Sequence, residues 1–234
     1  MSRTKIENQP KPPFPEQPIE PPGLESRMDP EPRYEAPLYR GSDKLLDQVA
    51  IVTGGDSGIG RAVAVLFARE GADVAIVHLA EEEEDARETI RSIEKEGRRG
   101  ISIPGDVSSF EFCKRAVERT VSELGRLDIL VNNAAYQNHV DSFDDLSLEQ
   151  WDHTFRVNIY GYFYMSKAAV PHMRDGGAIV NCGSIAGMRG SKGLVDYSAT
   201  KGAIHAFSKS LAQSLLDRGI RVNCVAPGPV WTPL

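Results

Sequence analysis

The 234-residue chain is predicted to adopt an α/β fold in which a doubly wound parallel sheet lies between two helical layers. Short apolar runs alternate with longer helical patterns from about residue 45 onward, which is typical of such a sheet. Glycine or polar residues follow the strand-like runs, where a ligand of an open α/β sheet binds. A hydrophobic content of 41% is enough for one domain with a sizeable core.

Each expected element has its own local pattern. The strand-like runs are residues 49–53, 73–78, 100–104, 127–132, 177–182 and 220–225. The helical stretches are residues 60–70, 82–96, 109–124, 147–173 and 197–217. Connections from strand through helix to parallel strand are expected to be right-handed.

A proline-rich extension, residues 1–42, precedes the domain that we assign to residues 43–234. Ten of the 15 prolines lie in this extension, which therefore cannot form a helix or an inner strand. Its composition favours a loosely attached tail. The alternative is an arm that lies along its own domain or a neighbouring subunit. Its apolar anchors would be Phe14, Ile19, Leu24, Tyr34, Leu38 and Tyr39.

Charge and composition argue against several functions. The net charge is −6 without a basic stripe, which makes nucleic-acid binding improbable. No apolar run approaches the ~20 residues that cross a bilayer, and the N-terminus lacks the apolar core of a secretion signal. The three cysteines and five histidines show no disulfide or metal-ligand spacing. We expect a cytoplasmic protein without membrane or metal.

A glycine-rich sequence, Thr53-Gly54-Gly55-Asp56-Ser57-Gly58-Ile59-Gly60, follows the first strand and opens a helix. This context is the one that a dinucleotide fingerprint needs, although the spacing G-x-x-x-G-x-G departs from the generic motif. Gly54 would make the tight turn, Gly58 would admit a pyrophosphate, and Gly60 would let the helix pack on the strand. The amides at the helix N-terminus would bind the phosphates. The alternative is an ordinary glycine-rich loop.

Tyr197 and Lys201 are four residues apart in a predicted helix, so their side chains share one face. A neighbouring ammonium group favours the phenolate and would lower the tyrosine pKa toward a range useful for acid–base catalysis. A helix can also place such a pair on its solvated face by chance.

Together these motifs resemble those of the short-chain dehydrogenase/reductase family from about residue 45 to the last residue. The sequence Asn132-Asn133-Ala134-Ala135 resembles the family's Asn-Asn-Ala-Gly element, and the segment from Pro227 to Thr232 resembles its Pro-Gly segment. The extension is similar to that of the glucose/ribitol-dehydrogenase-like subgroup. The resemblance implies a Rossmann-like fold.

The resemblance also implies the site residues. Tyr197 would exchange a proton with the substrate, Ser184 would bond to the substrate oxygen, and Lys201 would bond to the nicotinamide ribose. Asn158 would hold a water beside the lysine; the alternative is a helix residue satisfied by a local backbone bond. The predicted cofactor contacts are Gly54, Asp56, Ser57, Gly58, Ile59, Gly60, Glu81, Asp106, Val107, Asn133, Ala134, Tyr197, Lys201, Pro227, Gly228, Val230 and Thr232.

Three of these residues have structural alternatives. Asp106 would accept a hydrogen bond from the adenine amino group, or it would cap the next helix, for which Ser108 and Ser109 are equally suited. Asn133 and Ala134 would present backbone to the cofactor ribose, or they would only turn the chain at a strand end.

The preferred cofactor is expected to be NAD rather than NADP. Four glutamates, residues 81–84, follow the second strand, and their charge would repel a 2′-phosphate. Glu81 is the predicted ligand of the ribose 2′-hydroxyl, although it lies a few residues beyond the usual position. The alternative is that these acids only favour the positive end of the next helix.

The resemblance implies an NAD(P)-dependent oxidoreductase that transfers hydride to or from an aldehyde, ketone, sugar or secondary alcohol. The alternative is a catalytically silent cofactor-binding protein. Relatives continue beyond the Pro-Gly segment, so we expect the last strand of the family sheet to be absent. A homodimer or tetramer is expected through helices 109–124 and 147–173. The cluster Tyr160, Tyr162, Phe163, Tyr164 and Met165 could supply the contact, but core packing explains part of this cluster.

Overall fold

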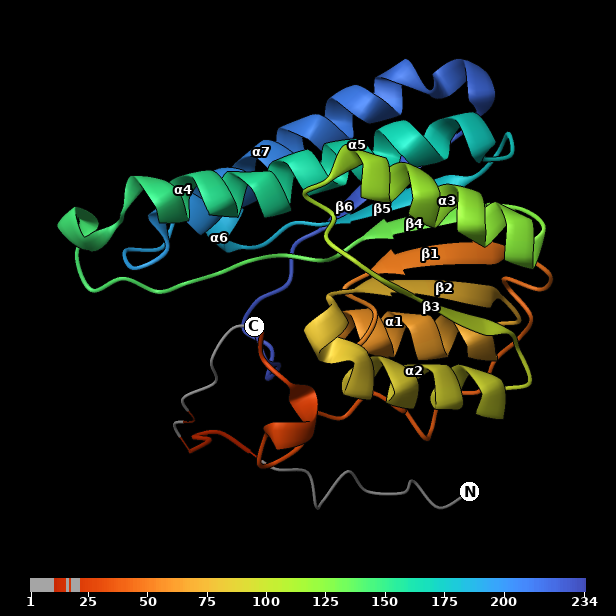
Figure 1. Cartoon of the computed structure of the whole chain (residues 1–234), viewed down its shortest axis with the longest axis horizontal. Helices are drawn as coiled ribbons and strands as arrows, with labels where there is room; N and C mark the ends of the chain where they lie inside the picture. Colours follow the sequence, from red (N-terminus) through yellow and green to blue (C-terminus); the bar gives the residue numbers. More distant parts are fainter. Residues whose placement is uncertain (1–10, 16, 18–21) are drawn as a thin grey trace.

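The computed structural model describes residues 11–15, 17 and 22–234 and contains one parallel sheet of six strands in the order β3-β2-β1-β4-β5-β6 (Figure 1). The predicted anchor Ile19 lies outside the described residues. The strands are β1 (Val49–Thr53), β2 (Asp73–His78), β3 (Gly100–Pro104), β4 (Ile129–Asn132), β5 (Ala178–Cys182) and β6 (Arg221–Val225). The predicted Rossmann-like fold is confirmed.

Helices cover both faces of the sheet (Figure 1). One layer holds α1 (Gly58–Arg69) and α2 (Glu83–Lys95). The other holds α3 (Phe110–Leu124), α4 (Leu148–Phe155), α5 (Gly161–Ala169) and α7 (Val195–Ser214), with the short α6 (Ala186–Arg189) beside α7. Every residue of β1 and β2 is buried because apolar side chains fill the space on both faces.

The strand order reverses beside β1, which pairs with β2 on one side and with β4 on the other. In such a sheet the loops that leave two neighbouring strands in opposite directions open a crevice, and ligands bind there. The loops after β1 and β4 begin at Gly54 and Asn133, so the fold brings two of the predicted cofactor segments to this point.

The predicted continuous helix 147–173 is wrong in detail. The structure has α4, then a π-helical turn at Arg156–Tyr160, then α5 and a 3₁₀ turn at Val170–His172. The amide of Gly161 donates to the carbonyl of Arg156, five residues earlier, which closes the wider π ring. The apolar pattern does not reveal one extra residue per turn, so the sequence alone does not predict this irregularity.

Smaller differences lie at element ends. The strand β4 begins at Ile129 rather than at residue 127, and α7 ends at Ser214 before a 3₁₀ turn, Leu216–Arg218. The helix α6 was not predicted, since four residues are too few to show a period. Within the described residues, no helix has the length and apolar character to cross a membrane.

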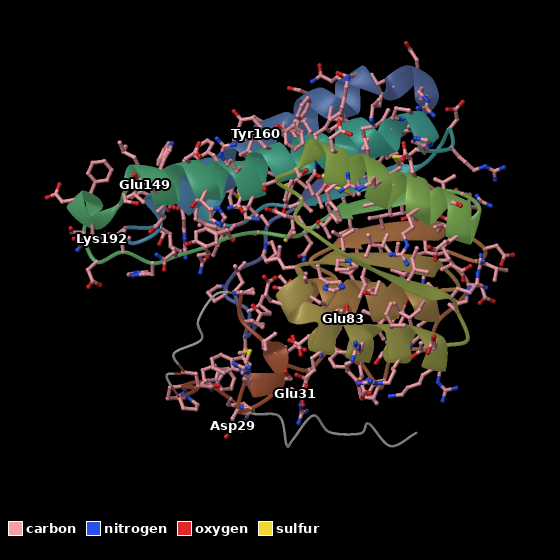
Figure 2. The ribbon with its side chains drawn as sticks, viewed as in Figure 1. Asp29, Glu31, Glu83, Glu149, Tyr160 and Lys192 are labelled. Atoms are coloured by element: carbon pink, nitrogen blue, oxygen red, sulfur yellow. The ribbon has the colours of Figure 1, made fainter. Side chains whose placement is uncertain are left out.

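The end of the extension, residues 22–42, lies along its own domain, and we call it the arm. Its buried side chains include Glu25 and Met28, neither of which was among the predicted anchors. Leu38 and Tyr39, which were, are 62% and 41% exposed. Figure 2 shows Asp29 and Glu31 where the arm runs below the α1–α2 layer.

Two other predicted anchors do contact the domain, since the Phe14 ring packs on Trp231 and the Tyr34 ring lies over the Arg61 guanidinium. The predicted alternative of an arm along its own domain is therefore met in part, although the buried Glu25 was not predicted.

Candidate active site

The loop between β1 and α1 has a backbone that requires glycine at three positions. Gly54 and Gly58 have φ values of +60° and +50°, which residues other than glycine rarely adopt. A Cβ atom at Gly60 would overlap the carbonyl oxygen of Gly54, so α1 packs against the turn as predicted. The amide of Arg61 makes the first intrahelical bond, to Ser57, which leaves the earlier amides of α1 without intrahelical acceptors.

Asn133 ties the loop after β4 to the glycine loop. Its side-chain Nδ2 donates to the carbonyls of Thr53 and Gly54, both at 3.1 Å. The amides of Asn133 and Ala134 both donate to the Thr53 hydroxyl, at 2.9 and 3.0 Å. Both backbone amides therefore already have an acceptor within the chain. The side chain of Asn133 holds the loop after β4 against the glycine loop and so fixes the shape of the crevice.

Asp106 does not cap α3. Its carboxylate accepts from the amide and the hydroxyl of Ser108, at 2.8 and 2.6 Å, while Ser109 caps the helix by accepting from Phe112. The Asp106 side chain remains exposed and accessible to a ligand. Val107 is buried, and its Cγ2 would lie 2.9 Å from a Cβ at Gly161, so it seats α5 against this loop.

The Pro-Gly segment after β6 closes over the glycine loop. The Pro227 carbonyl accepts from the Ile185 amide at 3.1 Å, and the Thr232 methyl group would lie 2.8 Å from a Cβ at Gly58. Val230 is 51% exposed and Gly228 lies beside Ile185. The segment therefore reaches the N-terminus of α1, where the sequence predicts cofactor contacts.

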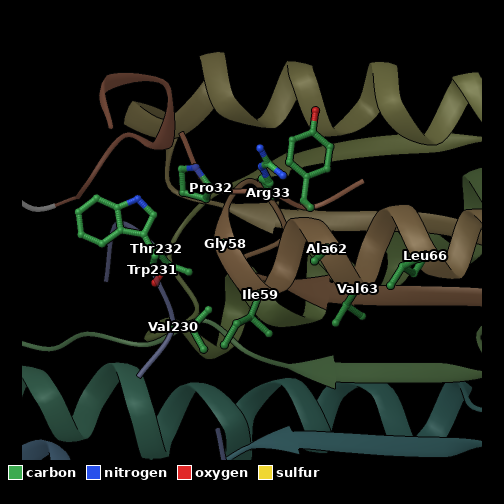
Figure 3. Close-up of a pocket in the computed structure, with 11 residues that line it drawn as sticks. Pro32, Arg33, Gly58, Ile59, Ala62, Val63, Leu66, Val230, Trp231 and Thr232 are labelled. Carbon is green, nitrogen blue, oxygen red and sulfur yellow. The ribbon is translucent and has the colours of Figure 1, made fainter. Parts of the chain in front are cut away.

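A pocket of about 200 Å³ lies between α1, the Pro-Gly segment and the arm (Figure 3). Ile59 and Val63 line it from α1, Val230 and Trp231 from the Pro-Gly segment, and Pro32 from the arm. No member of the predicted catalytic set lines it. The pocket therefore lies where these three segments meet, and it is separate from the predicted catalytic residues.

The predicted catalytic residues come together at the carboxyl end of β5. Tyr197 and Lys201 lie one turn apart on α7, with the lysine Nζ 5.3 Å from the centre of the tyrosine ring. Ser184 lies in the loop after β5, where its hydroxyl accepts from the Ala186 amide at 3.1 Å. All three side chains are buried, which excludes the alternative of a solvated helix face.

The ionisation of the pair differs from the expectation. Burial raises the pKa of Tyr197 to about 12, although a hydrogen bond with the Ser184 side chain opposes this effect. Burial also lowers the pKa of Lys201 to about 8. The lysine ammonium donates to the Cys182 carbonyl at 2.7 Å rather than to the phenol of Tyr197. The predicted lowering of the Tyr197 pKa is therefore wrong for the chain by itself, because desolvation is the largest effect on this phenol.

Asn158 lies in the π-helical turn and is fully buried. Its Oδ1 accepts from the Tyr136 amide at 2.7 Å, and its Nδ2 donates to the Tyr136 carbonyl at 2.9 Å and to the Thr200 hydroxyl at 3.1 Å. The side-chain amide of Asn158 is therefore satisfied by other segments, and the predicted alternative of a backbone bond within its own helix is wrong. Asn158 connects α7 to the loop after β4.

Sequence reasoning missed the role of Tyr162 beside Lys201, since it placed Tyr162 in a cluster divided between a subunit contact and core packing. Tyr162 is 2% exposed, and its hydroxyl donates to the Cys182 carbonyl at 3.0 Å and accepts from Lys201 at 3.4 Å. Met165 is also fully buried in the domain, whereas Tyr160 and Phe163 are exposed. One signal was available: Tyr162 follows Asn158 by four residues, and this spacing places both on one helix face.

The acids after β2 do not behave alike. Glu81 is exposed, whereas the Glu82 carboxylate folds back to accept from the Leu79 amide at 2.8 Å. Burial, and then the charge of Asp56, raises the pKa of Glu82 to about 8. Asp56 itself is buried, which raises its pKa. Carboxyl groups of the β1–α1 loop and of the segment after β2 therefore lie near one another.

Comparison with known proteins agrees with this geometry. Residues 48–234 match the model of the short chain dehydrogenase family, and the chain belongs to that family of oxidoreductases. The solved family members described below share its fold.

Three relatives illustrate the family. An uncharacterized oxidoreductase of Bacillus subtilis is 56% identical over 213 residues, which cover 91% of this chain and 73% of the relative. The glucose and ribitol dehydrogenase of Daucus carota is 46% identical over 218 residues, covering 91% and 75%. The NADPH-dependent aldehyde reductase 1 of Arabidopsis thaliana chloroplasts is 44% identical over 218 residues, covering 91% and 76%.

Two solved structures are similar in fold. A short chain dehydrogenase of Burkholderia cenocepacia in complex with NADP superimposes with a TM-score of 0.76 at 40% identity, covering 79% of this chain and 75% of that one. A short chain dehydrogenase of Mycobacterium paratuberculosis bound to NAD gives 0.77 at 34% identity, covering 81% and 75%. Both cofactors therefore occur among the neighbours of this chain.

Proposed function

We propose that the protein is an NAD(P)-dependent oxidoreductase that interconverts a carbonyl compound and an alcohol, with Tyr197 as the general acid and base. The observation that carries the proposal is the convergence of Tyr197, Lys201 and Ser184 at the carboxyl end of β5. This end of the sheet also holds the glycine loop and the Pro-Gly segment, which suit a dinucleotide.

The residues of the chain fit such a cofactor. The amides of Ile59 and Gly60, in the first turn of α1, have no acceptor within the helix and suit the pyrophosphate. Asp106 is exposed beside the crevice, where an adenine amino group would need an acceptor. Thr232 closes over Gly58 from the opposite side. The nicotinamide would supply or accept the hydride, and the protein would supply position and a proton.

In the direction of reduction, Tyr197 donates its phenolic proton to the alkoxide that develops on the substrate, while Ser184 hydrogen-bonds to the same oxygen. Fixed donors aimed at growing charge are an effective means of stabilising a transition state. The high pKa of Tyr197 keeps the phenol protonated at neutral pH, which suits this direction. In oxidation the proton moves back, and Lys201 then stabilises the phenolate.

We propose NAD as the preferred cofactor. The exposed carboxylates of Glu81 and Glu84 follow β2, on the side where the adenosine ribose would lie, and they would repel a 2′-phosphate. Arg61, the first basic residue of α1, is 1% exposed and bonded to Glu25 and Asp85, so it is not free to pair with that phosphate. Glu81 is exposed and accessible to the ribose 2′-hydroxyl.

Isothermal titration of the chain with NADH and NADPH in parallel tests this proposal first. Saturable binding of NADH, at least about tenfold tighter than NADPH, is expected. A panel of aldehydes, ketones, sugars and secondary alcohols then tests turnover, which Tyr197→Phe should reduce by about 10²–10⁴-fold with NADH affinity retained. A folded chain that binds NADH but turns over no member of the panel would favour the catalytically silent alternative.

A further inference from the structure

The arm places a buried carboxylate on the glycine loop. The Oε2 atom of Glu25 accepts from the Gly58 amide at 2.5 Å, and Gly58 is the first residue of α1. Ser57, at the N-cap position, makes no side-chain capping bond of its own. Glu25 therefore caps α1 from a segment 33 residues away in sequence.

Arg61 makes this contact part of a network that joins three segments. Its guanidinium donates to Glu25 Oε1 at 2.6 Å, to the Asp56 carbonyl of the loop at 2.8 Å, and to the Asp85 carbonyl of α2 at 3.0 Å. The Asp85 carboxylate in turn accepts from the Glu25 amide at 2.6 Å. Glu25, Arg61 and Asp85 are each at most 2% exposed, so these bonds are made away from water, where a lost partner is costly.

The arm also holds the segment on the other side of the loop. The Trp231 indole donates to the Pro30 carbonyl of the arm at 2.7 Å. The Trp231 ring also lies 4.5 Å from the ring of Phe14, which precedes the arm in the extension. Thr232, the next residue, is the one that closes over Gly58. Within six residues, Glu25 to Pro30, the arm thus fixes both walls of the proposed pyrophosphate site.

The Glu25 carboxylate occupies only part of the N-terminus of α1. Burial raises the pKa of Glu25, while the charge of Arg61 and the bond from the Gly58 amide work against this rise. The carboxylate uses only the first amide of α1. The amides of Ile59 and Gly60 belong to the same first turn and have no acceptor within the helix. They are available for a phosphate group.

We propose that the arm is a working part of the cofactor site, in which Glu25 is a positioning residue that holds the glycine loop in the conformation that binds the dinucleotide. The proposal rests on the proposed function. It predicts that loss of Glu25 weakens cofactor binding even when the chain stays folded, since the loop amides would lose their fixed direction.

The test compares Glu25→Ala with Glu31→Ala in the full chain. Glu31 lies on the same arm, is exposed, and is therefore a matched control (Figure 2). Isothermal titration with NADH, at a temperature where circular dichroism shows every variant folded, should give a Kd about tenfold or more higher for Glu25→Ala and unchanged for Glu31→Ala. Glu25→Gln keeps an acceptor for the Gly58 amide and should lose less, about threefold.

A second readout needs no cofactor. Hydrogen exchange of the peptide that contains Gly58 to Arg61 should be faster in Glu25→Ala than in the unmutated chain, and unchanged in Glu31→Ala. If Glu25→Ala does not fold, Glu25→Gln decides by both measurements. If the Glu25 variants are folded and bind NADH as tightly as the unmutated chain, the proposed role of Glu25 is overturned, whereas the proposed function is not. An unmutated chain that binds neither dinucleotide would overturn the proposed function as well.

Discussion

The ammonium group of Lys201 lies 3.4 Å from the hydroxyl of Tyr162, and both groups bond to the Cys182 carbonyl. The lysine side chain is thus held by a phenol on α5 and by the backbone of β5, in addition to its position one turn from Tyr197. Its direction is set by residues that lie far apart in the sequence.

Tyr162→Phe removes one acceptor from the lysine and should move Lys201 away from its working position. A hydrogen bond to the charged form supports that form, so its loss should lower the pKa of Lys201 further. We expect kcat/KM to fall about tenfold and the alkaline limb of its pH profile to move to lower pH. Steady-state kinetics across pH will measure both.

Tyr164→Phe is the control for that variant. Tyr164 lies two residues away on α5, is partly exposed and packs on Phe110 rather than on Lys201. Its pH profile should match that of the unmutated protein. Equal profiles for Tyr162→Phe and Tyr164→Phe would show that Tyr162 only fills space.

The buried lysine should make stability depend on pH. Burial lowers the pKa of Lys201 from its ordinary value of 10.5 to about 8 in the fold, so between these values the unfolded chain binds more protons. The free energy of unfolding therefore rises with pH across this window, by up to about 3 kcal/mol from this group. Below about pH 8 the burial of the charge is a net cost.

Lys201→Met measures that contribution, because methionine has a similar size and no charge. Urea unfolding at several pH values should show the variant more stable near neutral pH, with the difference shrinking as pH rises from about 8 toward 10.5. A difference that stays constant over this range would mean that Lys201 keeps an ordinary pKa in the fold.

Glu81→Ala should shift cofactor preference toward NADP by about tenfold or more, since the mutation removes the proposed ligand of the ribose 2′-hydroxyl and one negative charge. The ratio of the dissociation constants for NADH and NADPH is the measurement. Glu84→Ala removes the same charge from another exposed position and serves as the control. Equal shifts in both variants would indicate general electrostatics rather than a contact by Glu81.

The exposed aromatic residues of the outer helical layer should form a subunit contact. Phe163 and Tyr160 are 46% and 49% exposed, and each ring packs on Tyr164 (Tyr160 is labelled in Figure 2). Exposed aromatic side chains at a contact contribute strongly to association. Phe163→Asp should therefore reduce the dimer or tetramer to smaller species in sedimentation velocity.

Leu216→Asp introduces the same charge at a residue that is 71% exposed in the 3₁₀ turn after α7. It should leave the sedimentation coefficient unchanged. An unmutated chain that sediments as a monomer would contradict the predicted assembly, as would a Phe163→Asp variant of unchanged size.

The sequence by itself determined the sheet, the glycine loop and the positions of Tyr197 and Lys201, because these features depend on local periodicity and on short-range backbone geometry. The six strands and their order along the chain follow from apolar runs, and the i, i+4 pair follows from helical spacing. Gly54, Gly58 and Gly60 are needed for reasons that a local turn already contains.

Only the tertiary structure decided which side chains are buried together and how burial changes their ionisation. Glu25 and Arg61 are 36 residues apart in the sequence, and Tyr162 and Lys201 are 39 apart. A local sequence pattern therefore predicts neither contact. Desolvation depends on all the atoms packed around a group, which is why the pKa of Tyr197 rises where spacing alone predicted a fall.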